Sequence, residues 1–215
     1  IPTVNLSQFT FIDPGLYGLS YRSIAPMKGA PPVLPARFNP PPGVYAISTT
    51  TLEGIPLADP EMFDWFRKRE PEARVGHVMF VYHVKPSEPR AWVAQCAAPV
   101  APLEPQQITE GLGQSDVRLA YFDCTTSHLY PTGGKSSGWY ILAREASVGN
   151  VAWLSAARLS YEQKRTGFVP PFRIYEQDTP IYATGGPVRV APTALSLAEA
   201  VGEERRPISR RLFRG

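Results

Sequence analysis

Short apolar runs separated by turn residues are the main pattern along this chain. Residues 3–12 form the first run, with Val4 and Leu6 on its core side, and a turn signal, Asp13-Pro14-Gly15, ends it. Nearly unbroken apolar runs at 43–48 and 78–84 are typical of strands covered on both faces. The chain is therefore expected to consist of short strands, and further strands are predicted at 117–122, 139–142 and 172–175.

Helical spacing occurs between the strands expected at 43–48 and 78–84. Asp59 suits the N-cap and Pro60 the first helical position, while Pro71 ends the segment. A strand, a helix and a second strand form a crossover unit, and such units build parallel sheets. We therefore expect these two strands to belong to a parallel sheet, and we expect shorter helices over 106–110 and 194–205.

The two halves of the chain repeat one order of apolar runs. Residues 43–47 parallel residues 138–142, and Phe80-Val81-Tyr82 parallels the run from Phe172 to Tyr175. A third match pairs Phe11-Ile12-Asp13 with Tyr121-Phe122-Asp123, but its offset differs from the other two. Two explanations remain open: buried strands resemble one another, or two related lobes share a cleft at their strand ends.

Proline determines how these elements are connected. The chain has 24 prolines in 215 residues, mostly gathered at 25–42, 86–105 and 170–192. Proline lacks an N–H and fixes φ, so these stretches are expected to be extended connections. We predict an α/β fold with a mixed, mostly parallel sheet, crossover helices and long proline-rich connections, built as one lobe or as two similar lobes.

The same pattern suggests four parts of the chain. They are an α/β lobe at 1–85, a proline-rich connection with a short helix at 86–116, a second α/β or β-rich lobe at 117–178, and an extended tail with a terminal helix at 179–215.

Charge and hydropathy exclude two classes of protein. The formal net charge of +3 is too balanced for an electrostatic nucleic-acid binder. No run reaches the roughly 20 apolar residues that a membrane span needs. The sequence starts at Ile1 rather than Met and shows no signal peptide, so we expect a processed product or a piece of a longer chain.

Polar side chains at the strand exits are the candidate binding residues. Ligands of open α/β sheets bind at the carboxyl ends of strands. We therefore expect a cleft lined by Asp13, Ser48, Thr49, Thr50, Asp123 and Thr125. Tyr17 and Tyr21 add an aromatic patch that could contact a ligand. We predict no catalytic residue, no cofactor and no metal site.

Other residue patterns do not establish a site. The glycine-rich segment 132–138 lacks the first glycine of a phosphate loop and precedes a strand, so we expect a hairpin turn. Cys124 and His128 could pair as nucleophile and base, although such pairs are assembled by the fold rather than by a four-residue spacing. Cys96 and Cys124 fit either one disulfide or two buried thiols. Asn5 lies in a glycosylation pattern inside a predicted strand, which we interpret as a chance match.

A set of motifs in the first half resembles a known family. These motifs are Ser-x-Phe-x-x-x-Asp-Pro-x-x-Tyr-Gly at 7–18, Pro-Gly-x-Tyr-Ala-Ile-Ser at 42–48, Leu-x-Gly at 52–54, an aromatic and basic segment at 65–76, and Phe-Val-Tyr at 80–82. Their order is similar to that in the soluble tail of bacterial membrane glycosyltransferases of the protein-mannosyltransferase and aminoarabinose-transferase type. These enzymes use a polyprenyl-phosphate-linked sugar as donor.

The resemblance implies a non-catalytic extracytoplasmic domain of the cell envelope. The family's membrane helices and catalytic acidic residues are not in this sequence, so no catalytic residue carries over. The expected partners are a membrane glycosyltransferase or another membrane protein, together with a glycan or lipid-linked sugar, and not nucleic acid. Two alternatives remain: a structural or interaction subunit of a membrane or envelope assembly, and a small enzyme with its site at the strand carboxyl ends.

Overall fold

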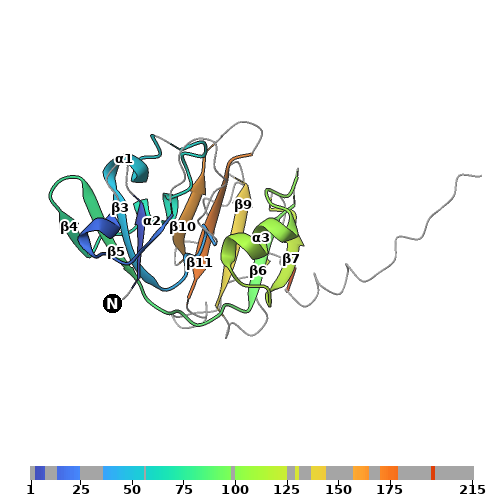
Figure 1. Cartoon of the computed structure of the whole chain (residues 1–215). Helices are drawn as coiled ribbons and strands as arrows, with labels where there is room; N and C mark the ends of the chain where they lie inside the picture. Colours follow the sequence, from blue (N-terminus) through green and yellow to red (C-terminus); the bar gives the residue numbers. More distant parts are fainter. Residues whose placement is uncertain are drawn as a thin grey trace, which may run out of the picture.

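Two five-stranded sheets form the body of the protein (Figure 1). The computed structural model describes residues 3–7, 14–24, 36–55, 57–97, 100–124, 129–130, 137–143, 157–164, 170–178 and 195–196. The first sheet contains β1 (Val4–Ser7), β2 (Tyr21–Ser23), β3 (Gly43–Ser48), β4 (Ala73–Val75) and β5 (Met79–Val84). The second contains β6 (Trp92–Cys96), β7 (Arg118–Phe122), β9 (Gly138–Ala143), β10 (Arg158–Gln163) and β11 (Phe172–Gln177).

The remaining elements are short. A 3-10 helix, η1 (Pro14–Tyr17), and three α-helices, α1 (Thr49–Leu52), α2 (Asp64–Arg67) and α3 (Pro105–Leu112), connect the strands. Two further strands, β8 (Leu129–Tyr130) and β12 (Leu195–Ser196), pair in parallel. Residues 195–196 thus form a strand where a helix is expected over 194–205, and the rest of that segment lies outside the described residues. No helix in the described part of the chain is long and apolar enough to cross a membrane.

The two sheets share one topology. The first has the strand order β2-β1-β3-β5-β4 and the second the order β7-β6-β9-β11-β10. In both sheets, the first three strands of this order run parallel to one another. The fourth strand pairs antiparallel with the third and with the fifth. Strands β3 and β9 are therefore equivalent, as are β5 and β11, in agreement with two of the three sequence matches. The third match does not follow the topology, because Tyr121 and Phe122 lie in β7, the equivalent of β2; residues 11–13 lie outside the described residues.

The expectation of a mostly parallel sheet is wrong, since both sheets are mixed. Strands β3 and β5, expected to belong to a parallel sheet, pair antiparallel from Gly43↔Val84 to Ser48↔Met79. The crossover through α1 and α2 does return the chain in parallel, but it leads to β4, because β4 and β3 are both antiparallel to β5. A hairpin turn at Gly76, whose φ of 59° favours glycine, then places β5 between them.

The helix expected from Asp59 to Pro71 is limited to the four residues of α2. Residues 60–63 form turns instead, and the backbone N–H of Met62 donates to the carbonyl of Asp59 at 3.2 Å. The Asp59 carboxylate accepts from the N–H of Glu61 and so caps this turn rather than α2. The helix expected at 106–110 is confirmed as α3, which begins at a capping box of Glu104 and Gln107 and ends at Gly113 in the left-handed region.

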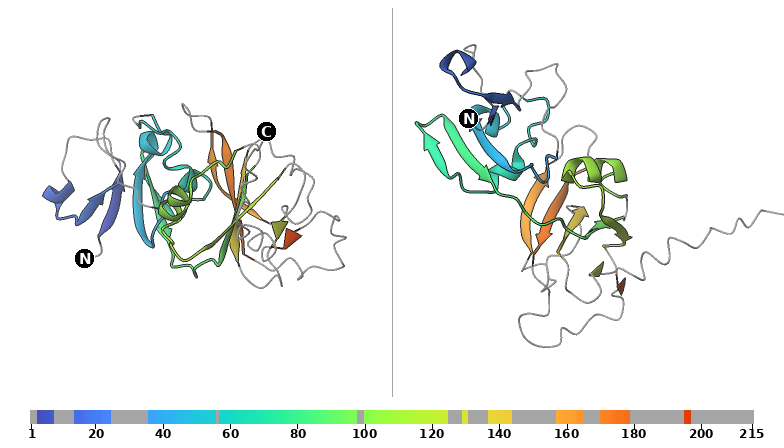
Figure 2. Two further views of the ribbon diagram at one scale, coloured as in Figure 1. Left: turned by 90° about the vertical axis from the view of Figure 1, so that its right-hand side faces the viewer. Right: turned by 60° about the horizontal axis from the view of Figure 1, so that its bottom comes forward.

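One core lies between the two sheets. α2 lies between β5 and β10 (Figure 1). α3 covers the face of the second sheet that contributes to this core. The core takes side chains from both sheets and from the helices between them, including Tyr45, Phe66, Ile108, Trp139 and Ile174. It therefore crosses the boundary that we expect at 85/86. In Figure 2, β1, β2 and η1 lie at the outer end of the first sheet, away from the second sheet.

A smaller core on the other face of the second sheet contains a disulfide. Cys96 at the end of β6 and Cys124 just after β7 are bonded, with 5.2 Å between their Cα atoms. Both residues are buried, beside Trp92 and Tyr140. Of the two alternatives for the cysteines, the disulfide is the one found. The interpretation of Cys124 as a nucleophile is therefore wrong, because a bonded sulfur carries no thiolate; His128 lies outside the described residues.

Candidate functional site

A pocket of about 520 Å³ lies where the two sheets meet. Its walls come from five segments: α2, the connection from β5 to β6, residues 36–42, the end of α3, and β10 with β11. The residues that line it include Pro40, Pro41, Pro42, Trp65, Arg69, Lys85, Glu88, Arg90, Gln114, Arg158 and Glu176. The proline-rich connection after β5 therefore crosses the pocket rather than lying apart from it.

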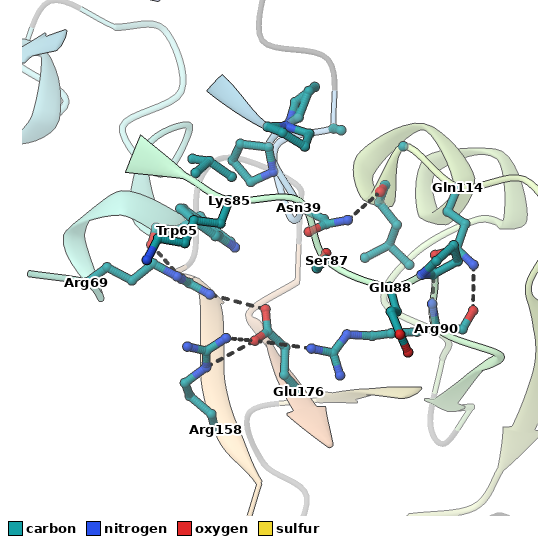
Figure 3. A pocket seen from close by; sticks show the side chains of 18 of the residues that line it. Asn39, Trp65, Arg69, Lys85, Ser87, Glu88, Arg90, Gln114, Arg158 and Glu176 are labelled. Atoms are coloured by element: carbon teal, nitrogen blue, oxygen red, sulfur yellow. Dashed lines mark hydrogen bonds and ion pairs between the residues drawn. The ribbon is translucent and has the colours of Figure 1, made fainter. Parts of the chain in front are cut away.

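A buried carboxylate with three arginines forms the polar wall (Figure 3). The side chain of Glu176 in β11 is 4% exposed. Its Oε1 accepts from Nη2 of Arg69 at 3.1 Å, and its Oε2 accepts from Nε of Arg158 at 3.0 Å. Nη2 of Arg90 lies 3.6 Å from the same Oε2. The Ser160 hydroxyl also donates to Oε1, at 2.6 Å, so both carboxylate oxygens have partners.

Backbone and aromatic contacts fix two of these arginines. Arg69, just after α2, donates to the carbonyl of Trp65 at 2.7 Å, and its guanidinium carbon lies 3.4 Å from the Trp65 ring centroid. Arg90 donates to the carbonyl of Gln177 at 3.1 Å and pairs with the Asp178 carboxylate at 2.5 Å. Arg69 and Arg90 thus join α2 and the β5–β6 connection to β11.

The third arginine faces solvent. Arg158 opens β10, and its side chain is 58% exposed while its Nε and Nη2 donate to Glu176. Lys85, also exposed, lines the same pocket from the β5–β6 connection. Arg158 and Lys85 are therefore the cations that a ligand entering from solvent can reach.

Positive charge is in excess at this site. Four cations, Arg69, Arg90, Arg158 and Lys85, line the pocket with two carboxylates, Glu88 and Glu176. Burial lowers the pKa of Arg69 to about 10; the charge of Glu176 opposes this change, and the charges of Arg158 and Arg90 add to it. The crowding of guanidinium groups favours an anion in the pocket.

Other parts of the lining are apolar. Pro40, Pro41 and Pro42 precede β3, and Trp65 presents a large ring that is mostly buried. The indole Nε1 of Trp65 is buried, and no residue of the described part of the chain accepts from it. A pocket with an apolar wall and a few convergent polar groups is typical of small-molecule sites. It fits a ligand that combines an anionic group with a ring or a short apolar body.

The hydroxyl residues predicted at the end of β3 lie together but cap a helix. Ser48 is the N-cap of α1, and its hydroxyl accepts from the N–H of Thr51 at 3.3 Å. The Thr49 hydroxyl donates to the carbonyl of His77 at 3.1 Å, and Thr50 is exposed on α1. Backbone contacts thus account for two of these three side chains.

The other predicted residues lie elsewhere. Tyr17 in η1 is 74% exposed and Tyr21 in β2 is 37% exposed, at the outer end of the first sheet. Asp123 follows β7 in the second sheet and is exposed. Asp13 and Thr125 lie outside the described residues. The structure does not bring the described members of the set into the pocket, because none of them lines it.

Sequence reasoning missed the arginine cluster. Its members come from the turn after α2, a loop and two strands, and no local spacing relates Arg69, Arg90 and Arg158. One local signal was available. The apolar run of β11 ends in Glu176 and Gln177, and a polar pair that continues a core strand indicates buried partners.

Among the residues that the structure describes, no group of three or more His, Cys, Asp or Glu side chains could hold a metal ion. Comparison of the chain with protein families, with curated proteins and with solved structures found no match.

Proposed function

We propose that this chain is a non-catalytic extracytoplasmic domain that works with a membrane glycosyltransferase and holds an acceptor or a lipid-linked sugar. The observation that carries the proposal is the pocket between the two sheets, which is lined by arginines, by prolines and by Trp65. The motifs at 7–84 supply the class of partner. In this proposal the domain binds and presents a ligand, and the bond-making groups belong to the membrane enzyme.

The chemistry of the pocket supports this class of ligand. A lipid-linked sugar carries a phosphate between a sugar and an apolar chain. Guanidinium groups bind phosphate oxygens through paired N–H donors, and a tryptophan ring can stack on a sugar or an isoprenoid unit. The cations and the apolar residues that line this pocket offer both kinds of contact.

Two further observations support a binding role in an oxidising compartment. The hydroxyls of Ser48 and Thr49 make capping and backbone contacts, and Cys124 is bonded to Cys96, so these strand-end groups already have structural roles. A structural disulfide is typical of proteins that mature in oxidising compartments. Both are in keeping with an extracytoplasmic domain that does not itself transfer sugar.

The proposal is tested with a short-chain prenyl-phosphate hexose and the matching neutral prenyl hexoside, titrated calorimetrically into the purified chain. We expect saturable binding of the phosphorylated compound and binding at least about tenfold weaker for the neutral one, since charge-assisted hydrogen bonds are lost. The immobilised chain should also retain a polyprenyl-phosphate-dependent glycosyltransferase, identified by mass spectrometry, from detergent-solubilised membranes. Absence of both forms of binding contradicts the proposal.

A second candidate function is a structural or interaction subunit of an envelope assembly. The outer end of the first sheet favours it, because Leu16 and Tyr17 of η1 are 79% and 74% exposed beside the edge strand β2. Exposed apolar residues and an open strand edge are features that partner chains cover. Cross-linking that joins η1 to a protein without glycosyltransferase activity favours this alternative.

A further inference from the structure

We propose that the pocket between the sheets is a phosphate-ester site in which Arg158 and Lys85 contact the anion while Arg69 and Arg90 position Glu176 behind it. This inference rests on the proposed function for the setting of the ligand, and on the geometry of the pocket for its chemistry. It assigns the recognised group to a phosphate, whether that phosphate is part of a free sugar phosphate or of a lipid head group.

The donors of Arg158 are divided between the protein and the pocket. Its Nε and Nη2 donate to Oε2 of Glu176, and its Nη1 has no partner in the described part of the chain. A guanidinium offers five N–H donors in one plane, so one edge can hold Glu176 while the other binds a ligand oxygen. With 58% of its side chain exposed, Arg158 is accessible without any rearrangement of the core.

Arg69 and Arg90 have a different role. Arg69 also donates to the backbone carbonyl and the hydroxyl of Ser160, and Arg90 donates to the carbonyl of Gln177 and pairs with Asp178. They orient Glu176, which in turn fixes Arg158, and they contribute positive potential at the back of the pocket. They are therefore positioning residues rather than direct contacts.

The charges of the site favour a phosphate over another carboxylate. The one carboxylate that the cluster needs for its own geometry is Glu176, and Asp178 pairs with Arg90. The four cations of the site exceed the three carboxylates Glu88, Glu176 and Asp178 by one positive charge. The excess is two positive charges when the exposed Asp178 side chain turns to solvent. A phosphate ester has several terminal oxygens and can accept from Arg158 and Lys85 together.

The apolar wall provides the rest of the site. The prolines before β3 and the Trp65 ring, on which Arg69 stacks, line the rest of the pocket, and no residue of the described part of the chain accepts from the buried Nε1 of Trp65. A volume of about 520 Å³ is within the range of small-molecule sites. The site therefore fits a phosphate joined to a sugar ring or a short apolar group.

The test is a titration of the folded chain with inorganic phosphate, a hexose 1-phosphate, a short-chain prenyl phosphate and the neutral hexose. We expect all three phosphates to bind and the hexose not to bind. Arg158→Gln should weaken phosphate binding about tenfold or more, and Lys85→Gln should weaken it several-fold, because each removes a charge-assisted contact. Tighter binding of the hexose ester points to a soluble sugar phosphate, and tighter binding of the prenyl ester points to a lipid head group.

Arg118→Gln is the matched control. Arg118 and Arg158 are both exposed first residues of strands in the second sheet, but they lie on opposite edge strands, β7 and β10. The control variant should bind phosphate as the unchanged chain does. Equal weakening in both variants would show that only net charge matters, and it would overturn the site.

Glu176→Gln separates a ligand site from a purely structural cluster. The substitution removes the internal anion, so a phosphate should bind several-fold more tightly and should raise the melting temperature of this variant more than that of the unchanged chain. A cluster that serves only stability predicts destabilisation with no gain in phosphate affinity. That second result overturns the inference.

Failure of this inference can be told from failure of the proposed function. If the chain binds the membrane transferase but no phosphate ester, the phosphate site is wrong and the accessory role stands. If phosphates bind with the expected dependence on Arg158 but neither a lipid-linked sugar nor a transferase is retained, the site stands and the proposed function is wrong.

Discussion

Individual charged residues hold the two sheets of this protein together. Arg37 donates to the Asp59 carboxylate at 2.6 Å and to the Gln163 side chain at 2.8 Å, and it also donates to the Tyr161 hydroxyl. Burial raises the pKa of Tyr161 well above its usual range although the charge of Arg37 opposes this, so the hydroxyl stays protonated and donates to Gln163. The contacts of Arg37 thus connect the segment before β3 to β10.

Removal of Arg37 should strongly destabilise the fold. Arg37→Met removes a charged donor from Asp59 and from two buried polar groups of β10, and we expect the free energy of unfolding to fall by about 3 kcal/mol. Urea denaturation followed by circular dichroism measures this change. The exposed Arg118→Met should change it by less than about 0.5 kcal/mol; a similar loss in both variants contradicts the role given to Arg37.

At the scale of elements, the disulfide joins two parallel neighbours at the carboxyl end of β6. The bond between Cys96 and Cys124 closes a loop that contains α3 and β7, with a sequence separation of 28. Restricting the unfolded chain over such a loop stabilises a protein by roughly 3–4 kcal/mol in the chain-entropy account. The disulfide therefore stabilises the α3 side of the second sheet.

Replacement of both cysteines by alanine should lower the free energy of unfolding by about 3 kcal/mol. The reductant dithiothreitol should lower the urea midpoint of the unchanged chain and leave that of the double variant unaffected. A thiol titration of the unfolded, unreduced chain should find no free thiol. Detection of two thiols contradicts the bond.

Strands β10 and β11 carry a charged pair that makes stability depend on pH. Glu162 lies directly opposite Arg173, and its Oε1 accepts from Nε of Arg173 at 2.9 Å. Burial raises the pKa of Glu162, but the hydrogen bond and charge of Arg173 outweigh burial and hold the pKa below its usual value. The unfolded chain therefore binds the proton more readily, and the stabilisation present above about pH 4.5 is lost as the pH falls through the folded pKa.

Glu162→Gln should accordingly reduce stability at pH 7 by about 0.5–1 kcal/mol and leave it nearly unchanged at pH 3. Urea midpoints at the two pH values measure the difference. Glu53→Gln, at an exposed position after α1, should show no such pH dependence. An equal effect of Glu162→Gln at both pH values argues against the ionic pair.

The sequence pattern predicts the helices and strands better than it predicts which of them lie next to one another. The runs at 43–48, 78–84 and 139–142 form strands because they are almost wholly apolar, and α3 forms where its proline and capping residues indicate. The direction of β5 was missed because it depends on a hairpin at Gly76 and on insertion between β3 and β4, neither of which leaves a periodic signal. The arginine cluster was missed for the same reason, since Arg69 and Arg158 meet only through the packing of α2 on β10.

At the scale of the whole molecule, two sheets of one topology face each other across a shared core, with the pocket at their junction. Equivalent strands β3 and β9 begin with Gly-Val-Tyr and Gly-Trp-Tyr, so the repeat is visible in sequence at the central strand of each sheet. The chain between β5 and β6, which joins the two sheets, also supplies Lys85 and Arg90 to the pocket. A ligand in the pocket would therefore contact the connection that joins the two sheets.

The central claim, that the ligand of this protein binds between the two sheets, is tested most directly by a ¹H–¹⁵N NMR titration with a hexose 1-phosphate. We predict saturable shifts of the Trp65 indole signal and of the backbone amides of Lys85, Glu88 and Gln114, which line the pocket. The signals of Tyr17, Thr49 and Asp123 should stay in place. Shifts confined to those three residues, or no saturable shift at the pocket, would contradict the claim.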